Sequence, residues 1–356
     1  MNQPLGHSDG SLHAMPAPAP TQAPAYGTDY RAPGWLPGAH PQTIWPVVVG
    51  RARPVNLERV RWPTPDHDFV DVDLARPSGT PRALLILFHG LEGSSRSQYA
   101  QSIMRAAQGR GWLAAVAHFR GCGGQINLAP RAYHSGDSAE IHWMLGRFAQ
   151  QWPDLARYAV GVSLGGNALM KWAGESGHNA TRVISGCAAV SAPQDLHASA
   201  IALSRGFCRV YTRHFLHSLK DKSLRKLAQY PGLFDRQRML RADDFFAFDD
   251  AVTAPMHGFA SCLDYWARSS CRQFLADVRV PSLMLNARND PFLPPMHLAR
   301  PDQVSSSVML DYPAAGGHAG FLSGHLPGRN DWLGERMVRW FEQIGPDGAV
   351  TNDHHG

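Results

Sequence analysis

Residues 161–165 read Gly-Val-Ser-Leu-Gly, directly after the apolar residues 158–160 and directly before Gly-Asn-Ala-Leu-Met-Lys-Trp-Ala (166–173), which has helical spacing. A serine hydroxyl is a weak nucleophile, and it becomes accessible when a sharp turn from a strand to a helix holds it outward. Glycines on either side let the neighbouring backbone pass close to such a turn. The spacing therefore predicts that Ser163 is an exposed, candidate nucleophilic serine.

Length and composition limit the class of protein. The chain has 356 residues, of which 44% are hydrophobic and 18% charged, so it can bury a substantial core. No run approaches eighteen apolar residues, and the N-terminus lacks the basic start and apolar stretch of a signal peptide, so we expect a cytoplasmic chain. Five cysteines without a CxxC pair favour free thiols. No metal-ligand spacing and no nucleic-acid-binding motif occurs, and neither partner is expected.

The chain divides by composition into three parts. Residues 1–30 are rich in Pro, Ala, Gly and Ser, and this composition predicts a disordered N-terminal segment. Residues 346–356 are predicted to be a flexible tail, and residues 31–345 a single domain.

Within that domain, apolar runs alternate with amphipathic ones. Expected strands are 58–62, 69–75, 83–88, 113–118, 158–162, 182–190, 282–287 and 307–312, and expected helices are 97–109, 137–150, 166–175 and 333–344. Central strands such as 83–88 are apolar without alternation, which is typical of parallel strands covered on both faces. The pattern predicts an α/β fold with a mostly parallel eight-stranded sheet between two layers of helices.

A nucleophilic serine needs a base that takes its proton and an acid that orients the base. Asp290 follows the expected strand 282–287, and His318 lies among glycines after the last expected strand. Both positions belong to the carboxyl edge of a parallel sheet, where ligands bind in such folds. The order serine, acid, histidine is also the chain order in the fold that carries this type of serine turn. We therefore predict Ser163, Asp290 and His318 as a catalytic triad.

An oxyanion formed during attack needs two backbone donors. The amide that follows the nucleophile, Leu164, is one candidate, and the turn after the third strand supplies the amide of Leu91 as the other. His89 in the same turn is interpreted as a structural residue, because the base is already assigned. Cys122 is interpreted as a small apolar loop residue, and Ser135 or Asp137 as the cap of the helix that follows.

Several motifs extend beyond the serine turn. They are Gly34-Trp-Leu-Pro-Gly-Ala-His-Pro-Gln-Thr43, His89-Gly-Leu-Glu-Gly-Ser-Ser95, Arg120-Gly-Cys-Gly-Gly124, Tyr133-His-Ser-Gly136, Gly161-Val-Ser-Leu-Gly-Gly-Asn-Ala-Leu169, Asn289-Asp-Pro-Phe292 and Gly316-Gly-His-Ala-Gly-Phe321. With these motifs, residues 33–344 resemble the YheT-like esterase branch of the α/β-hydrolases, which is related to eukaryotic lipid hydrolases. The resemblance implies an α/β-hydrolase fold, hydrolysis of carboxylic esters without a cofactor, and the same three triad residues.

Two positions depart from the pattern of that branch. Asn289 stands where an acidic residue is expected beside the catalytic aspartate, and Tyr265-Trp266 stands where two tyrosines are more usual. The first departure leaves the triad intact, whereas the second is expected to reshape the pocket.

The separation of Ser163 from Asp290 leaves room for an insertion at about 194–273, where this fold carries a helical lid. The insertion is rich in aromatic residues, and an apolar acyl or aryl pocket is one interpretation, while packing of the lid on the core is the other. Residues 201–241 hold ten Lys or Arg against two Asp, and 203–214 are expected to form an amphipathic basic helix. A solvated lid face and a weak contact with an anionic membrane both remain open.

The residues predict a serine hydrolase that cleaves short- to medium-chain or monoacylglycerol-like esters through an acyl-enzyme on Ser163. One alternative is an acyltransferase that uses the same acyl-enzyme, and another is a non-catalytic ligand-binding protein on the same scaffold. The oligomeric state does not follow from the sequence.

Overall fold

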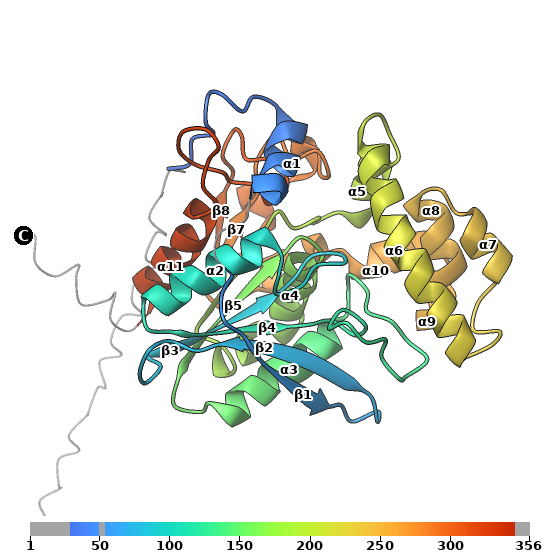
Figure 1. The fold of residues 1–356 in the computed structure, drawn as a ribbon, viewed down its shortest axis with the longest axis horizontal. Helices are drawn as coiled ribbons and strands as arrows, with labels where there is room; N and C mark the ends of the chain where they lie inside the picture. Colours follow the sequence, from blue (N-terminus) through green and yellow to red (C-terminus); the bar gives the residue numbers. More distant parts are fainter. Residues whose placement is uncertain (1–28, 50–53, 346–356) are drawn as a thin grey trace, which may run out of the picture.

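Eight strands form one sheet in the order β1-β2-β4-β3-β5-β6-β7-β8 (Figure 1). The computed structural model describes residues 29–49 and 54–345, so residues 1–28 of the predicted disordered segment, and the predicted tail, lie outside the described residues. The strands are β1 (Glu58–Pro63), β2 (Phe69–Ala75), β3 (Ala83–Phe88), β4 (Leu113–Ala117), β5 (Ala156–Val162), β6 (Gly186–Val190), β7 (Ser282–Leu285) and β8 (Val308–Asp311). Within this sheet the pairs β1–β2 and β2–β4 are antiparallel, and the other five pairs are parallel. The predicted sheet is confirmed.

Helices cover both faces of this sheet. Helices α3 (Ser138–Gln151) and α4 (Leu164–Ser176) share one core cluster with the strands, and α2 (Gln98–Gly109) and α11 (Trp332–Ile344) share the other. The packing of β3 explains why apolar and polar residues do not alternate in its sequence. Leu84 and Ile86 lie in the first cluster, and Leu85 and Leu87 lie in the second. Both of its faces are buried, so neither face carries polar side chains.

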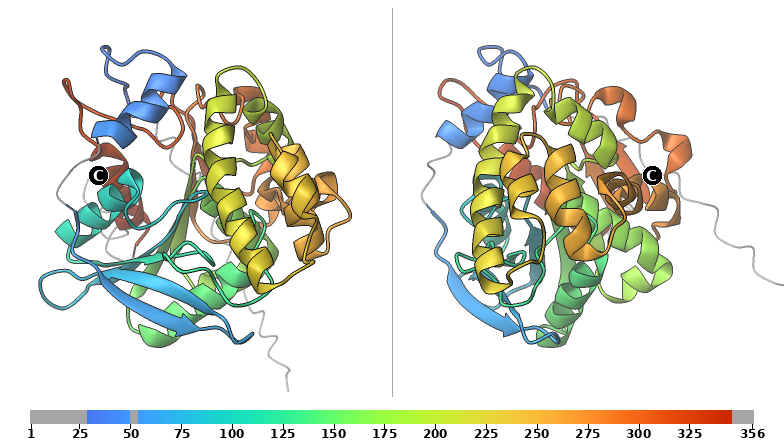
Figure 2. Two further views of the ribbon diagram at one scale, coloured as in Figure 1. Left: turned by 45° about the vertical axis from the view of Figure 1, so that its right-hand side comes forward. Right: turned by 90° about the vertical axis from the view of Figure 1, so that its right-hand side faces the viewer.

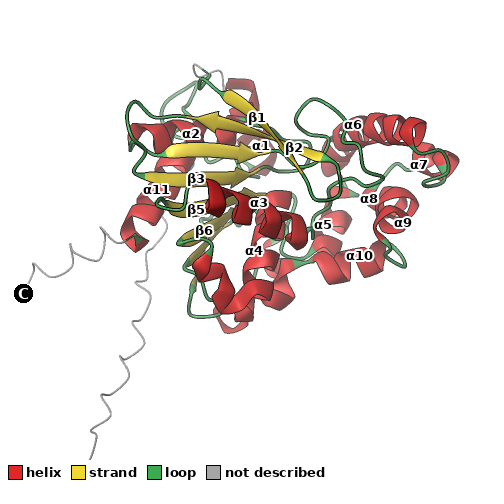
Figure 3. Ribbon diagram, turned by 90° about the horizontal axis from the view of Figure 1, so that it is seen from below, coloured by secondary structure: helices red, strands yellow, loops and turns green. Residues whose placement is uncertain are grey.

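The helical insertion, residues 194–273, lies beyond the carboxyl ends of the strands (Figure 3). It contains α5 (Leu196–Leu203), α6 (Cys208–Gln229), α7 (Arg236–Arg241), α8 (Phe245–Phe248), a π-helical turn (Asp249–Thr253), α9 (Ala254–His257) and α10 (Cys262–Ser269). Figure 2 shows α6 running along one side of the molecule, with the shorter helices packed beside it.

Two details differ from the sequence predictions. The expected continuous basic helix over 203–214 is wrong, because Gly206 has a φ of +51° and separates α5 from α6. As a result Phe207 and Val210 are exposed, while Cys208, Thr212 and Leu216 form the buried side of α6. The strand expected from 182 begins only at Gly186, because Gly177–Arg182 form a 3₁₀ helix.

Helix α1 (Ala39–Val49) was not predicted. It contains Pro46, and its sequence has no clear division into a polar and an apolar side. Prolines and an uneven pattern both lower the helical signal of a sequence. The helix nevertheless has a defined place, beside the loop that carries His318.

Candidate active site

Ser163 lies at the junction of β5 and α4, with φ of 53° and ψ of −120°. This left-handed conformation is costly for a residue other than glycine, and it is typical of functional sites. The flanking glycines explain how the turn is made. A Cβ on Gly165 would lie 2.6 Å from the carbonyl oxygen of His89, and one on Gly161 would lie 2.6 Å from the Cα of Gly166. Helix α4 can therefore begin directly against β3 and β5 only with glycine at both positions.

The structure brings Ser163, His318 and Asp290 together. The Nε2 atom of His318 lies 2.9 Å from the Ser163 hydroxyl, and its Nδ1 atom lies 2.9 Å from Oδ2 of Asp290. Asp290 follows β7, is nearly fully buried, and also accepts a hydrogen bond from the amide of Phe292 through Oδ1. With the Nδ1 proton on the Asp290 side, Nε2 is free to accept the serine proton.

The two predicted oxyanion donors border the same cavity as Ser163. Among the hydrogen bonds of the described residues, neither the amide of Leu91 nor that of Leu164 has an acceptor. The turn that carries Leu91 is fixed by His89, whose Nδ1 donates to the carbonyl of Gly90 and whose Nε2 accepts from the amide of Phe119. Burial lowers the pKa of His89 to about 3, so the ring stays neutral. This arrangement favours the structural interpretation of His89.

Helix α1 holds the loop of His318 in place. The side-chain oxygen of Thr43 accepts from the amide of His318, and that of Gln42 accepts from the amide of Gly316. Asn289 donates to the same oxygen of Gln42 and accepts from the amide of Gly317. We call Gln42, Thr43 and Asn289 the loop clamp. The sequence marked all three positions through motifs but assigned no role to them.

A cavity of about 170 Å³ lies between the triad and the helical insertion. Apolar side chains of the insertion form much of its wall, and they are Leu196, Leu203, Phe215, Leu219, Phe245, Phe248, Val252, Met256 and Trp266. Trp266 donates to Oδ2 of Asp249, and Tyr265 accepts from the amide of Ser135. Tyr265 and Trp266, which stand where two tyrosines are more usual in the resembling branch, therefore both line the pocket. Aromatic residues of the insertion both line the pocket and pack against one another.

Several buried titratable groups border this apolar cavity. Burial raises the pKa of Asp249 to about 6, and it lowers the pKa of His134 to about 4 and that of His257 to about 3. The two histidines are thus neutral near pH 7. Hydrogen bonds from Thr253 and Trp266 partly offset the burial of Asp249.

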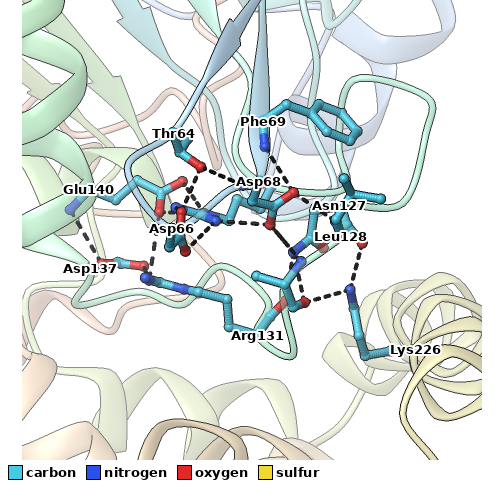
Figure 4. Close-up of polar contacts among 12 residues, drawn as sticks. Thr64, Asp66, Asp68, Phe69, Asn127, Leu128, Arg131, Asp137, Glu140 and Lys226 are labelled. Carbon is cyan, nitrogen blue, oxygen red and sulfur yellow. Dashed lines mark hydrogen bonds and ion pairs between the residues drawn. The ribbon is translucent and has the colours of Figure 1, made fainter.

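Loop 126–135, which forms another wall, is fixed by a polar network around Asp68 (Figure 4). Asp68 accepts hydrogen bonds from the side chain of Asn127 and from the amides of Leu128 and Ala129, and it pairs with Arg120. Burial opposes ionisation of Asp68, but these hydrogen bonds outweigh it and lower its pKa to about 2.

The same network reaches the helical insertion. Lys226 on α6 donates to the carbonyls of Asn127 and Ala129, and burial lowers its pKa to about 8. Lys222, one turn earlier, pairs with Glu92 in the turn after β3. Two of the ten basic residues in 201–241 thus point inward and tie α6 to the loops around the site.

Other candidates take the structural roles that were predicted for them. Asp137 accepts from the amide of Glu140 and so caps α3. Cys122 lies beside Lys222, but burial raises the pKa of its thiol to about 11, so it is a poor nucleophile near pH 7. All five cysteines are free thiols.

Within residues 29–49 and 54–345, no group of three or more His, Cys, Asp or Glu side chains is arranged to hold a metal ion. Over the same ranges, no helix is long and apolar enough to cross a membrane.

Comparison with known proteins agrees with this arrangement. Residues 83–325 match the family model described as alpha/beta hydrolase fold. The chain is 36% identical over 307 residues to the Escherichia coli protein named "Putative esterase YheT", with 85% of this chain and 89% of that protein covered. It is 27% identical over 281 residues to the monoacylglycerol lipase ABHD2 of Bos taurus, covering 73% of this chain and 65% of the lipase.

Among solved structures, the Pyrococcus furiosus esterase Pf2001 has a TM-score of 0.53 at 12% sequence identity, covering 82% of this chain and 94% of the esterase. At this identity the likeness concerns the fold alone. The sheet order, the serine turn and the family match over more than half of the chain lead to one conclusion: the chain belongs to the α/β-hydrolase family, in the branch that contains YheT.

Proposed function

We propose that this protein is a serine hydrolase that cleaves carboxylic esters through an acyl-enzyme on Ser163. The observation that carries the proposal is the continuous chain of hydrogen bonds from the Ser163 hydroxyl through His318 to Asp290. Its relatives named as an esterase and as a monoacylglycerol lipase support the same class of reaction.

The geometry supports a two-step reaction. His318 removes the proton of Ser163 as the serine oxygen attacks the ester carbonyl, and Asp290 stabilises the imidazolium that results. The amides of Leu91 and Leu164 donate to the oxyanion. Collapse of the tetrahedral intermediate breaks the ester bond, and His318 gives its proton to the leaving alcohol. Water then attacks the acyl-enzyme with His318 as base, which releases the acid and restores the serine.

The cavity supports a limited acyl length. Its volume of about 170 Å³ is below the roughly 300–1,000 Å³ of drug-sized ligand pockets. A short- to medium-chain acyl group, or an ester of the monoacylglycerol type, suits this apolar space. The chemistry needs only the side chains and amides named above, and no cofactor takes part in it.

The test is hydrolysis of a p-nitrophenyl ester series from acetate to palmitate by the wild type and Ser163→Ala. We expect turnover that falls steeply for the longest acyl chains and is lost in the variant. A burst of about one nitrophenol per enzyme without an acceptor, followed by steady release only when an alcohol or amine is added, would instead favour the acyltransferase. No turnover together with no labelling by a fluorophosphonate would favour a binding protein.

A further inference from the structure

Large apolar side chains gather at one place on the surface. The described residues include ten exposed large hydrophobic side chains, and six of them lie on three neighbouring segments. These six are Ile44, Val47 and Val48 on α1, Phe207 and Val210 at the start of α6, and Leu326. Each is 38% to 66% exposed. We call these six residues the apolar patch.

Side-chain contacts show that the three segments adjoin one another. The ring of His40 on α1 lies 4.7 Å from that of Phe207, and the indole of Trp45 donates to the carbonyl of Pro327 at 2.9 Å. Figures 1 and 2 show α1 and the N-terminal end of α6 at the same end of the molecule. The patch thus spans elements that are far apart in the sequence.

The patch lies close to the candidate active site. A series of ring contacts leads inward from Phe207 through Tyr211 and Phe292 to His318, with centroid separations of 5.8, 4.9 and 4.1 Å. Helix α1 also carries Thr43, which binds the amide of His318. A surface that contacts the patch is therefore separated from His318 only by the rings of Phe207, Tyr211 and Phe292.

Positive charge dominates the segments that carry the patch, although Arg329 is paired with Asp331 just beyond them. The segments 30–49, 196–220 and 312–330 contain no Asp or Glu, while they hold Arg31, Arg205, Arg209, Arg213, Lys220 and Arg329. Arg205 and Arg213 are exposed and have no ion-pair partner among the described residues, and Arg209 only approaches Asp243 at 3.7 Å. Exposed apolar side chains can enter the acyl region of a bilayer, and unpaired arginines beside them can bind anionic lipid headgroups. The two kinds of side chain together therefore suit a membrane surface that contains anionic lipid.

We propose that the apolar patch docks this protein on anionic membranes, with Phe207, Val210 and the outer side of α1 in the interface and the arginines on lipid headgroups. Exposed apolar surface of this kind marks interaction sites, and the basic surroundings select an anionic partner. An ester that lies in the bilayer would then reach Ser163 from the docked side. The proposal concerns binding alone, so it does not depend on the proposed function.

The test is sedimentation of the full chain with vesicles of phosphatidylcholine alone or mixed with phosphatidylglycerol. We expect the protein to sediment with the mixed vesicles only. Ser163→Ala should sediment to the same extent as the wild type, because binding needs no turnover. Arg205→Gln/Arg213→Gln should weaken the partition coefficient about thirtyfold, since each basic residue near an anionic surface contributes about a factor of five. Val47→Ser/Val48→Ser should weaken it by more than about tenfold.

Matched controls lie outside the patch. Leu263→Ser removes an equally exposed apolar side chain from α10, and Arg225→Gln removes an exposed arginine from the far half of α6. Neither should change the partition coefficient. Circular dichroism and the urea midpoint of each patch variant check folding, and Leu326→Ser provides an independent variant on another segment.

Three outcomes would overturn the proposal. The first is that the wild type stays in the supernatant with both kinds of vesicle. The second is that patch and control variants sediment alike. The third is a dimer in light scattering that Val47→Ser/Val48→Ser dissociates while vesicles recover no protein, because the patch would then join two copies of this chain.

Discussion

The side-chain oxygen of Gln42 accepts from the amide of Gly316, two residues before His318, and from the side chain of Asn289, directly before Asp290. Gln42 belongs to the motif that spans residues 34–43, but the sequence predicted no chemical role for it. Asn289 is suited to this arrangement because its amide group donates to Gln42 while its oxygen accepts from Gly317. A carboxylate at 289 would have no proton to donate there. The departure at Asn289 therefore belongs to the positioning of His318 rather than to proton transfer.

Gln42→Ala should lower kcat about tenfold to a hundredfold with little change in KM, because small displacements of a reacting group are that costly. The measurement is ester hydrolysis normalised to the fraction of enzyme that a fluorophosphonate titrates, which removes any loss of folded protein. Gln237→Ala, at an exposed position on α7, is the control. A normalised kcat equal to that of the wild type would show that the loop clamp serves stability only.

At the scale of elements, the junction of β5 and α4 depends on glycine at 165. A Cβ there would collide with the carbonyl oxygens of Phe88 and His89, which are backbone atoms and cannot move aside. Gly165→Ala should therefore lower the free energy of unfolding by at least about 2 kcal/mol, as overpacking does elsewhere, and abolish hydrolysis.

Gly146→Ala is the matched control for this substitution. Gly146 lies within α3, and a Cβ there would meet no atom within 4 Å. The change should raise stability by about 0.5–1 kcal/mol, because alanine is the better helix former. Urea denaturation of both variants measures the difference. If Gly165→Ala were as stable as the wild type, our account of the turn would be wrong.

The elements that sequence could predict are those with a strong local signal. The eight strands of the sheet are continuous apolar runs or alternate clearly. Helices α2, α3 and α11 present one apolar side to the sheet, and α4 is buried on all sides over most of its length. Helix α1 has no such pattern, and it is held by contacts with residues almost 300 positions away. The break at Gly206 was missed because the apolar residues Leu203, Phe207 and Val210 keep a helical spacing across the glycine.

At the scale of the whole molecule, Asp68 joins three regions that are distant in sequence. It connects the start of β2 with loop 126–131 and, through the carbonyls that Lys226 binds, with α6 (Figure 4). Nothing in the sequence pairs these regions, since a single aspartate in a turn has no periodic signal. The triad could be predicted because each member follows a strand, whereas this network could not.

The pKa of Asp68 is lowered from 3.8 to about 2 in the folded protein, so its ionised form stabilises the fold. That contribution is fully present above about pH 4 and is lost as the pH falls through about 2. Asp68→Asn should lower the free energy of unfolding near pH 7 by about 2 kcal/mol, since several bonds to a charged acceptor are weakened.

The difference in unfolding free energy between the wild type and Asp68→Asn should be equal near pH 7 and pH 5 and smaller near pH 3. Urea denaturation at the three pH values measures it, with the exposed Asp154→Asn as the control. A difference that stays constant down to pH 3 would mean that the charge of Asp68 does not hold these regions together.

The central claim is that Ser163 becomes acylated with His318 as its base. It is tested most directly by intact-mass and peptide mass spectrometry after reaction with a fluorophosphonate, for the wild type, Ser163→Ala and His318→Gln. We predict one adduct on the peptide that contains Ser163, none in Ser163→Ala, and labelling slowed by at least about a hundredfold in His318→Gln. An adduct on another residue, or undiminished labelling of Ser163→Ala, would contradict the account.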